Sequence, residues 1–190
     1  MTRPPSAADS VLPGTTGTDE RNRRRRWPGV LAAAVALVLV ASVTGVLPVR
    51  IMRVGSDSMS PTIATGDLVL VTRGDGDVER RDVVVVDHPE TGALLVKRAV
   101  ATGGDRLAIE DGVLVVNGEP VCEPGIDPAR LDGVFFGPVT VARGEVFLLG
   151  DDRASSIDSR AFGAVPADEV TGVVGSRLWP SPGGLPDEHC

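Results

Sequence analysis

The sequence is poor in the side chains that most often build metal sites and catalytic bases. It has two cysteines, Cys122 and Cys190, and two histidines among 190 residues. Two cysteines are too few for a disulfide framework or for a zinc site of the CxxC kind. We expect Cys122 to be structural or free, and a bridge to Cys190 requires the end of the chain to fold back within reach.

A net positive charge is confined to one segment. Residues 1–27 hold six arginines against three acidic residues, although the whole chain has a formal net charge of -7. The rest of the chain is therefore strongly acidic. Phosphate binding needs clustered lysine and arginine on a folded surface, so this charge distribution argues against nucleic acid as a partner.

The N-terminal 47 residues divide into two parts. Residues 1–28 are rich in Pro, Ser, Thr, Gly and Arg, which predicts a disordered, basic tail. Residues 29–47 carry no charge, and as a helix they would span about 28 Å, close to the thickness of a bilayer core. The preceding arginines and Trp27 predict a transmembrane helix with a cytoplasmic N-terminus. A cleaved secretory signal is the alternative, and the length of the apolar run favours a retained anchor.

Residues 48–178 are predicted to form a β-rich domain, and residues 179–190 a loose tail. Short valine-rich runs alternate with Gly, Pro and Asp clusters, which is typical of an all-β sandwich or barrel. Asn117-Gly118 predicts a tight type I′ hairpin. With a single apolar run before it, this domain is expected on the extracytoplasmic side. The predicted strands are 49–54, 68–72, 82–87, 93–100, 112–116, 134–141, 145–149 and 170–178.

Ser58 lies in the turn-prone stretch VGSDSMSPTI, residues 54–63. Its Ser, Gly, Asp and Pro neighbours exclude a long helix or a central strand, so the loop can present a hydroxyl to a ligand. A serine needs a base to act as a nucleophile. His88 in the turn DHPE and His189 near the end of the chain are not easily placed beside Ser58. An ordinary Ser/Pro loop is the alternative.

Lys97 is the only lysine, against eighteen arginines. In the predicted strand ALLVKRAV, alternation sends Lys97 and Arg98 to opposite faces, so one of these cations faces inward. Burial lowers the pKa of a lysine and lets its neutral amine accept a proton, whereas arginine stays protonated. Lys97 could thus form a serine-lysine dyad with Ser58. A lysine extending to solvent at a sheet edge is the alternative.

The loop LLGDDRASSIDSR, residues 148–160, follows an apolar strand and is rich in Asp, Arg and Ser. Paired carboxylates raise the possibility of a divalent metal. The arginines of the same loop can neutralise those carboxylates with bidentate contacts, which argues against one.

Taken together, these stretches resemble type I signal peptidases, the membrane-anchored serine proteases that cleave signal peptides from exported proteins. Four segments match the family's boxes in order: SDSMSPTI at 56–63, GDLVLV at 66–71, KRAVATGGD at 97–105, and GDDRASSIDSR at 150–160 with FGAVP after it. The resemblance implies a mainly β catalytic domain behind one N-terminal transmembrane helix, with no cofactor and no metal. The lysine box implies the bacterial kind.

Matching positions imply a role for six residues. Ser58 is implied as the nucleophile and Lys97 as the general base. Ser56, with the Ser58 amide, would hold the oxyanion, and Ser156 would orient the lysine amine. Two further residues, Asp158 and Arg160, match an ion pair that supports the site.

Three positions depart from the family's pattern. Asp57 stands where glycine is common, Ala101 replaces a usual glycine, and Asp152 replaces a usual asparagine. A carboxylate at Asp57 would oppose the negative charge that develops in the oxyanion, if it pointed there.

The resemblance implies a bacterial cytoplasmic-membrane enzyme whose partners are the lipid bilayer and secreted preproteins, cut after small residues. Two alternatives remain open. One is a catalytically inactive, membrane-anchored β-domain that binds a partner; the other is a peptidase with the same dyad and a specialised substrate.

Overall fold

The computed structural model describes residues 29–37, 41, 48–74, 77–123, 126 and 135–185. The chain forms two units, residues 1–44 and residues 45–190, which are described separately. In the first unit, residues 29–37 are helical. Among the described residues, no helix is both long enough and apolar enough to cross a membrane. The predicted tail at 1–28 and part of the predicted anchor at 29–47 lie outside the described residues.

The second unit consists mainly of strands, which confirms the mainly β prediction. Among the described residues, a short α-helix and a 3-10 helix lie between the strands. The elements are β1 (Val49–Arg53), β2 (Leu68–Arg73), β3 (Val83–Asp87), β4 (Leu94–Thr102), β5 (Arg106–Glu110), β6 (Val113–Val116), β7 (Glu119–Pro120), β8 (Phe136–Thr140), β9 (Glu145–Leu149), α2 (Ser159–Phe162), β10 (Val165–Pro166), η2 (Ala167–Glu169), β11 (Val170–Trp179) and β12 (Gly183–Gly184).

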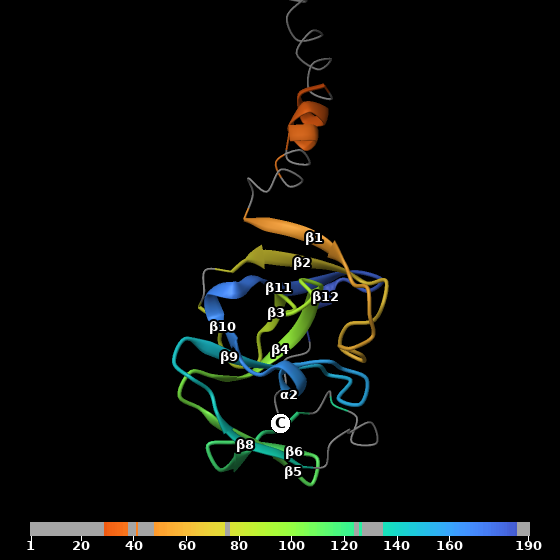
Figure 1. Ribbon diagram of the computed structural model, residues 1–190. Coiled ribbons are helices and arrows are strands. Elements are labelled where there is room, and N and C mark those ends of the chain that lie inside the picture. Colours follow the sequence, from red (N-terminus) through yellow and green to blue (C-terminus); the bar gives the residue numbers. More distant parts are fainter. Residues whose placement is uncertain are drawn as a thin grey trace, which may run out of the picture. The chain divides into compact units, whose positions relative to one another are not determined.

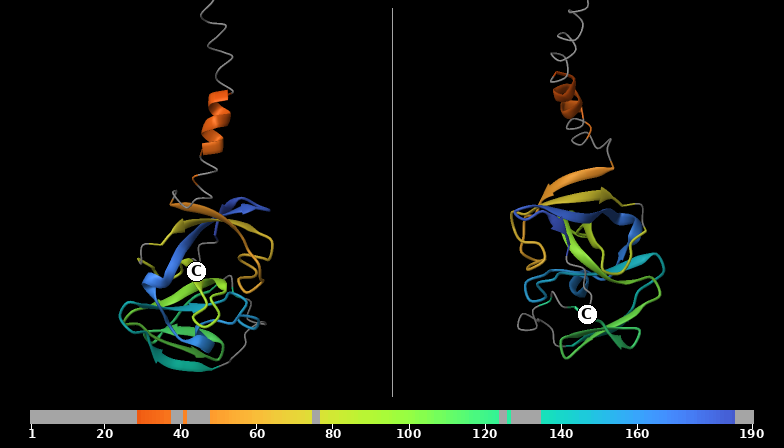
Figure 2. Two further views of the ribbon diagram at one scale, coloured as in Figure 1. Left: turned by 45° about the horizontal axis from the view of Figure 1, so that its top comes forward. Right: turned by 180° about the vertical axis from the view of Figure 1, so that it is seen from behind.

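These strands form two antiparallel sheets (Figure 1). The larger sheet has the order β1-β2-β11-β3-β4-β9-β10, with β12 paired to β11. The smaller sheet has the order β7-β6-β5-β8 and lies beyond β9, at the far side of the unit from β1. Figure 2 shows the same succession from two further directions. Strand β4 therefore lies inside the unit, with strands on both sides of it.

Strand β3 explains why the valine runs of this sequence do not alternate with polar residues. Val83 and Val85 pack into one apolar cluster, which includes Val54, Met59 and Ile63. Val84 and Val86 pack into a second cluster with parts of β9, β10 and β11. A strand that is covered on both faces needs apolar residues at successive positions.

The predicted hairpin at Asn117-Gly118 is confirmed. Both residues have positive φ, 57° and 85°, as a type I′ turn requires, and they join β6 to β7. Strand β5 was not predicted. Asp111 and Gly112 between β5 and β6 also have positive φ, 49° and 77°, so this Asp-Gly pair was a second hairpin signal that could have located it.

The expectation of a loose C-terminal tail needs correction, and the open choice for Cys122 between a structural and a free cysteine is resolved. The tail predicted as loose from residue 179 contains the end of β11 and the short strand β12, in which Gly183 and Gly184 pair with β11. Glycine supplies main-chain hydrogen-bonding groups without an apolar side-chain pattern, so no strand signal is visible in this segment of the sequence. Cys122 is disulfide-bonded rather than free. Cys190, the other cysteine of the sequence, lies outside the described residues.

Candidate active site

The loop that carries Ser58 is closed by backbone hydrogen bonds and pinned by apolar side chains. Val54 N donates to Asp67 O at 2.9 Å, and Gly66 N donates to Val54 O at 2.9 Å, so the two ends of the loop are joined. Met59 and Ile63 are fully buried. Because the residue directly after Ser58 is anchored in the core, the loop holds Ser58 in a defined position.

Ser58 and Lys97, which the sequence analysis paired, are in direct contact. The Lys97 Nζ lies 2.7 Å from Ser58 Oγ and donates a second hydrogen bond to Val96 O at 3.1 Å. Lys97 is 2% exposed. Burial lowers the pKa of the Lys97 amine to about 8, although the carboxylates of Asp158 and Asp151 act in the opposite direction. A substantial fraction of the amine is therefore neutral slightly above neutral pH, and a neutral amine can accept the Ser58 proton.

The neighbouring cation, Arg98, is also buried. The sequence analysis expected one of Lys97 and Arg98 to face inward, but both do, because β4 is covered on both faces. Arg98 makes a bidentate contact with Asp151, from Nε to Oδ1 at 2.8 Å and from Nη2 to Oδ2 at 2.7 Å. The carboxylate of Asp151 is thereby occupied by an arginine, as the sequence analysis expected for this loop, although the arginine comes from β4.

The hydroxyl of Ser56 lies beside that of Ser58, with the two Oγ atoms 3.3 Å apart. Asp57, between them, turns its carboxylate away: its Oδ1 accepts a hydrogen bond from Thr65 N at 2.8 Å, across the loop. The carboxylate that could have opposed an oxyanion is therefore directed to a backbone amide.

Ser156 is near the dyad but does not make the expected hydrogen bond to Lys97. Its Oγ is buried and has no hydrogen-bond partner among the residues that the structure describes. The side chain lies against Gly150, where an added Cβ would overlap Ser156 and approach Ser58 O to 2.5 Å. Val96 O, rather than Ser156, accepts the second hydrogen bond of the lysine amine.

Asp158 and Arg160 form the ion pair that the resemblance implied. Asp158 is buried, caps α2, and binds Arg160 Nε at 2.9 Å through Oδ1. Its Oδ2 accepts a hydrogen bond from Gly150 N at 3.0 Å. Arg160 Nη2 also donates to Arg153 O at 2.6 Å. The pair thus ties the two ends of the 150–160 loop together.

The other two departures from the family pattern are accommodated by the fold. Ala101 is fully buried within the apolar cluster that joins the smaller sheet to β4 and β9. Asp152 donates its backbone N–H to Ser58 O at 3.0 Å, so its main chain contributes directly to the position of the candidate nucleophile.

The two histidines were weaker candidates for the base that activates Ser58. His88 lies in the turn after β3, where its Nδ1 accepts a hydrogen bond from Glu90 N at 3.1 Å and its ring packs against Phe162. These contacts of His88 are thus with its own turn and with α2, and none of them is with Ser58. His189 lies outside the described residues.

The sequence analysis missed three residues that shape the site: Gly150, Arg153 and Glu123. Arg153 is 2% exposed, and its Nε donates to Gly150 O at 3.0 Å. Its Nη2 forms an ion pair with Glu123, which follows β7. The signal available in the sequence was Arg153 itself, a charged residue next to an apolar strand, but its partner is thirty residues away.

The chain is similar to known proteins over most of its length. Residues 24–179 match the family model described as signal peptidase, peptidase S26. A signal peptidase I of Bacillus caldolyticus is 35% identical over 175 residues, which cover 85% of this chain and 93% of that protein. A signal peptidase IB of Staphylococcus aureus (strain COL) is 30% identical over 170 residues, covering 80% and 88%. The crystal structure of a signal peptidase I from Enterococcus faecalis V583 aligns with a TM-score of 0.47 and 28% identity, over 51% of this chain and 96% of that chain.

Proposed function

This chain belongs to the signal peptidase family, peptidase S26, and we propose from that premise that it is a serine endopeptidase that removes signal peptides from exported preproteins. The observation that carries the proposal is the 2.7 Å contact between Lys97 Nζ and Ser58 Oγ, in a buried setting that lowers the lysine pKa to about 8. An inactive binding domain has no need for a desolvated lysine against a serine, because burying an ammonium group costs folding free energy.

In the proposed mechanism, the neutral amine of Lys97 takes the hydroxyl proton of Ser58 as the Ser58 oxygen attacks the scissile carbonyl carbon. The tetrahedral intermediate collapses to an acyl-enzyme when the leaving amine accepts a proton from the Lys97 ammonium. A water molecule, deprotonated by the neutral amine of Lys97, then attacks the acyl-enzyme. The Lys97 ammonium returns its proton to the Ser58 oxygen as the product leaves. Lys97 thus acts as base and acid in turn.

Negative charge on the attacked oxygen needs hydrogen-bond donors that are already in place. We assign this role to the Ser58 backbone amide and the Ser56 hydroxyl. The 3.3 Å separation of the two serine oxygens supports Ser56, and the engagement of Asp57 with Thr65 N keeps a carboxylate out of the same space.

Ser156 is proposed to bind the lysine amine once Ser58 is acylated. At that stage Lys97 loses the Ser58 hydroxyl as a partner. The Ser156 hydroxyl is buried against Gly150, without a hydrogen-bond partner in the described part of the chain, and Gly150 also adjoins Ser58. A buried hydroxyl without a hydrogen bond is costly, so both groups would gain from the contact. Asp158 and Arg160 hold the surrounding loop and take no part in proton transfer.

The proposed location is the bacterial cytoplasmic membrane. Residues 29–47 are the proposed single anchor, residues 1–28 the cytoplasmic tail, and residues 48–178 the extracytoplasmic domain. The arginine run before an uncharged apolar segment supports this orientation. Ser58 follows Leu47 by eleven residues, a reach of at most about 40 Å, which keeps the site near the bilayer where preproteins emerge.

The test is cleavage of a secretory precursor by the full-length protein in detergent. The wild type should release the mature protein, and Ser58→Ala and Lys97→Ala should lose at least 1,000-fold in rate. Ser60→Ala, in the same loop, is the matched control and should keep the wild-type rate. Cleavage by either dyad variant at the wild-type rate, or none by the wild type, would refute the proposal.

A further inference from the structure

A buried arginine supports the loop beneath the proposed dyad. Arg153 is 2% exposed and lies in the turn after β9. Its Nε donates to Gly150 O at 3.0 Å, and its own carbonyl accepts from Arg160 Nη2 at 2.6 Å. Gly150 in turn adjoins both Ser58 and Ser156, with no room for a side chain. The position of the Gly150 carbonyl therefore bears on two residues of the proposed site.

The positive charge of Arg153 is balanced by a carboxylate that lies outside the four family motifs. Its Nη2 pairs with the carboxylate of Glu123, which belongs to the smaller sheet's side of the domain. The backbone around Glu123 is held by two hydrogen bonds: Val121 N donates to Leu114 O at 2.7 Å, and Ile126 N donates to Glu123 O at 3.0 Å. The adjacent Cys122 is disulfide-bonded. The carboxylate is thus presented from a fixed backbone.

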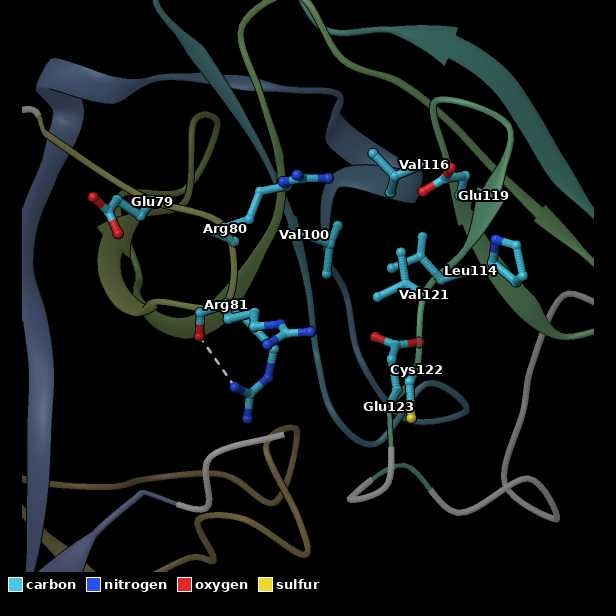
Figure 3. Close-up of a pocket in the computed structure, with 13 residues that line it drawn as sticks. Glu79, Arg80, Arg81, Val100, Leu114, Val116, Glu119, Val121, Cys122 and Glu123 are labelled. Atoms are coloured by element: carbon cyan, nitrogen blue, oxygen red, sulfur yellow. Dashed lines mark hydrogen bonds between the residues drawn. The ribbon is translucent and has the colours of Figure 1, made fainter. Parts of the chain in front are cut away.

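Glu123 also lines a cavity of about 630 Å³ between the two sheets. Figure 3 shows Arg80 and Arg81 on one wall of this cavity and Glu119, Cys122 and Glu123 on the other. Arg98, another lining residue, forms the ion pair with Asp151. Two ion pairs therefore connect the walls of the cavity to the loop that begins at Gly150. In one, the cation Arg98 of the wall pairs with Asp151 of the loop; in the other, the carboxylate Glu123 of the wall pairs with Arg153 of the loop.

We propose that Glu123 is a positioning residue for the Ser58–Lys97 dyad, acting through Arg153 and the Gly150 carbonyl. The inference rests on the proposed peptidase function and adds to it a residue of the smaller sheet. Without the carboxylate, the buried guanidinium has no counter-charge and would turn toward water or another acceptor. Gly150 would then lose the donor that holds its carbonyl. The dyad geometry should suffer while precursor binding does not.

The test measures kcat and KM for precursor cleavage, with thermal unfolding of the same samples. Glu123→Gln should lower kcat at least tenfold and leave KM within about twofold. Glu123→Asp restores the charge and should recover part of the lost kcat. Glu119→Gln, which removes an exposed carboxylate on the same cavity wall, is the matched control and should match the wild type.

If Glu123→Gln fails to fold, the double variant Glu123→Leu with Arg153→Met tests the positioning role instead, because it buries no unpaired charge. It should fold and retain the tenfold loss of kcat. Wild-type kcat in Glu123→Gln or in the double variant, or an equal loss in Glu119→Gln, would overturn the inference. When only this inference fails, the wild type still cleaves the precursor and Ser58→Ala does not. When the wild type itself does not cleave the precursor, the proposed function is refuted.

Discussion

Lys97 and Arg98 are adjacent on β4 and both are buried, yet their surroundings differ in one respect. Arg98 is matched by the carboxylate of Asp151 in a bidentate contact, at 2.7 and 2.8 Å. Within the described part of the chain, Lys97 forms no ion pair and is bound by a hydroxyl and a backbone carbonyl. The arginine remains a paired cation, while the lysine has a pKa of about 8. Burial therefore makes Lys97 the candidate base, because an amine can lose its proton and no carboxylate of the described residues pairs with it directly.

The two cations should not be exchangeable. Lys97→Arg keeps a positive charge at the same place, but guanidinium does not deprotonate, so the base is lost. Precursor cleavage under single-turnover conditions should fall at least 1,000-fold.

The matched control for this exchange is Arg98→Lys, which keeps a cation for Asp151 without the bidentate geometry. It should retain at least one tenth of the wild-type rate. Equal losses in Lys97→Arg and Arg98→Lys would show that both cations act only by position.

Neutral replacements should change stability in opposite directions. Arg98→Met leaves the Asp151 carboxylate buried and unpaired, and should lower the free energy of unfolding by about 3–5 kcal/mol. Lys97→Met removes a buried amine whose folded-state pKa lies below its unfolded value. At pH 7, below both values, the protonated amine destabilises the fold, so Lys97→Met should raise the free energy of unfolding.

Urea denaturation at several pH values measures both effects. The wild type should gain stability as pH rises from about 8 toward 10.5, because in that window the unfolded chain binds the proton that the folded amine has lost. Lys97→Met should lack this gain. A gain of the same size in the variant would assign the pH dependence to other groups.

The rate of cleavage should depend on pH through the same amine. Below the Lys97 pKa, kcat should rise with pH about tenfold per unit and then level off above about 8. Asp158→Asn removes the carboxylate that contributes most to raising this pKa, so the midpoint should move to lower pH, by up to about one unit. An unchanged or higher midpoint, with chemistry rate-limiting, would contradict the assignment of Lys97 as base.

The smallest effect is expected on the nucleophile loop. Asp57→Asn keeps the Oδ1 acceptor for Thr65 N and should retain the wild-type kcat. Asp57→Gly, which introduces the glycine common in the family, loses this hydrogen bond and should lower kcat by about threefold to tenfold. A higher kcat in Asp57→Gly would show that the carboxylate hinders catalysis, as its charge alone suggests.

The sequence analysis located the proposed dyad because both residues carry local signals. Ser58 lies in a Ser/Pro turn, and Lys97 is the only lysine in a chain that otherwise uses arginine. The motif order also predicted the family. For Ser156, matching position implied a hydrogen bond to the lysine, but its Oγ lies buried against Gly150 and has no hydrogen-bond partner among the described residues. A rotamer is set by packing neighbours, which a motif does not specify.

By itself, the sequence determined the strand-rich character of the domain, the Asn117-Gly118 turn and the residue types of the dyad, since these follow from propensities and chemistry within short segments. The tertiary structure alone decided which cations form ion pairs with a carboxylate. Asp151 reaches Arg98 across fifty-three positions, and Glu123 reaches Arg153 across thirty. Desolvation and ion pairing depend on atoms from distant strands, so the burial of Lys97 and the lowering of its pKa follow only from the tertiary structure around β4.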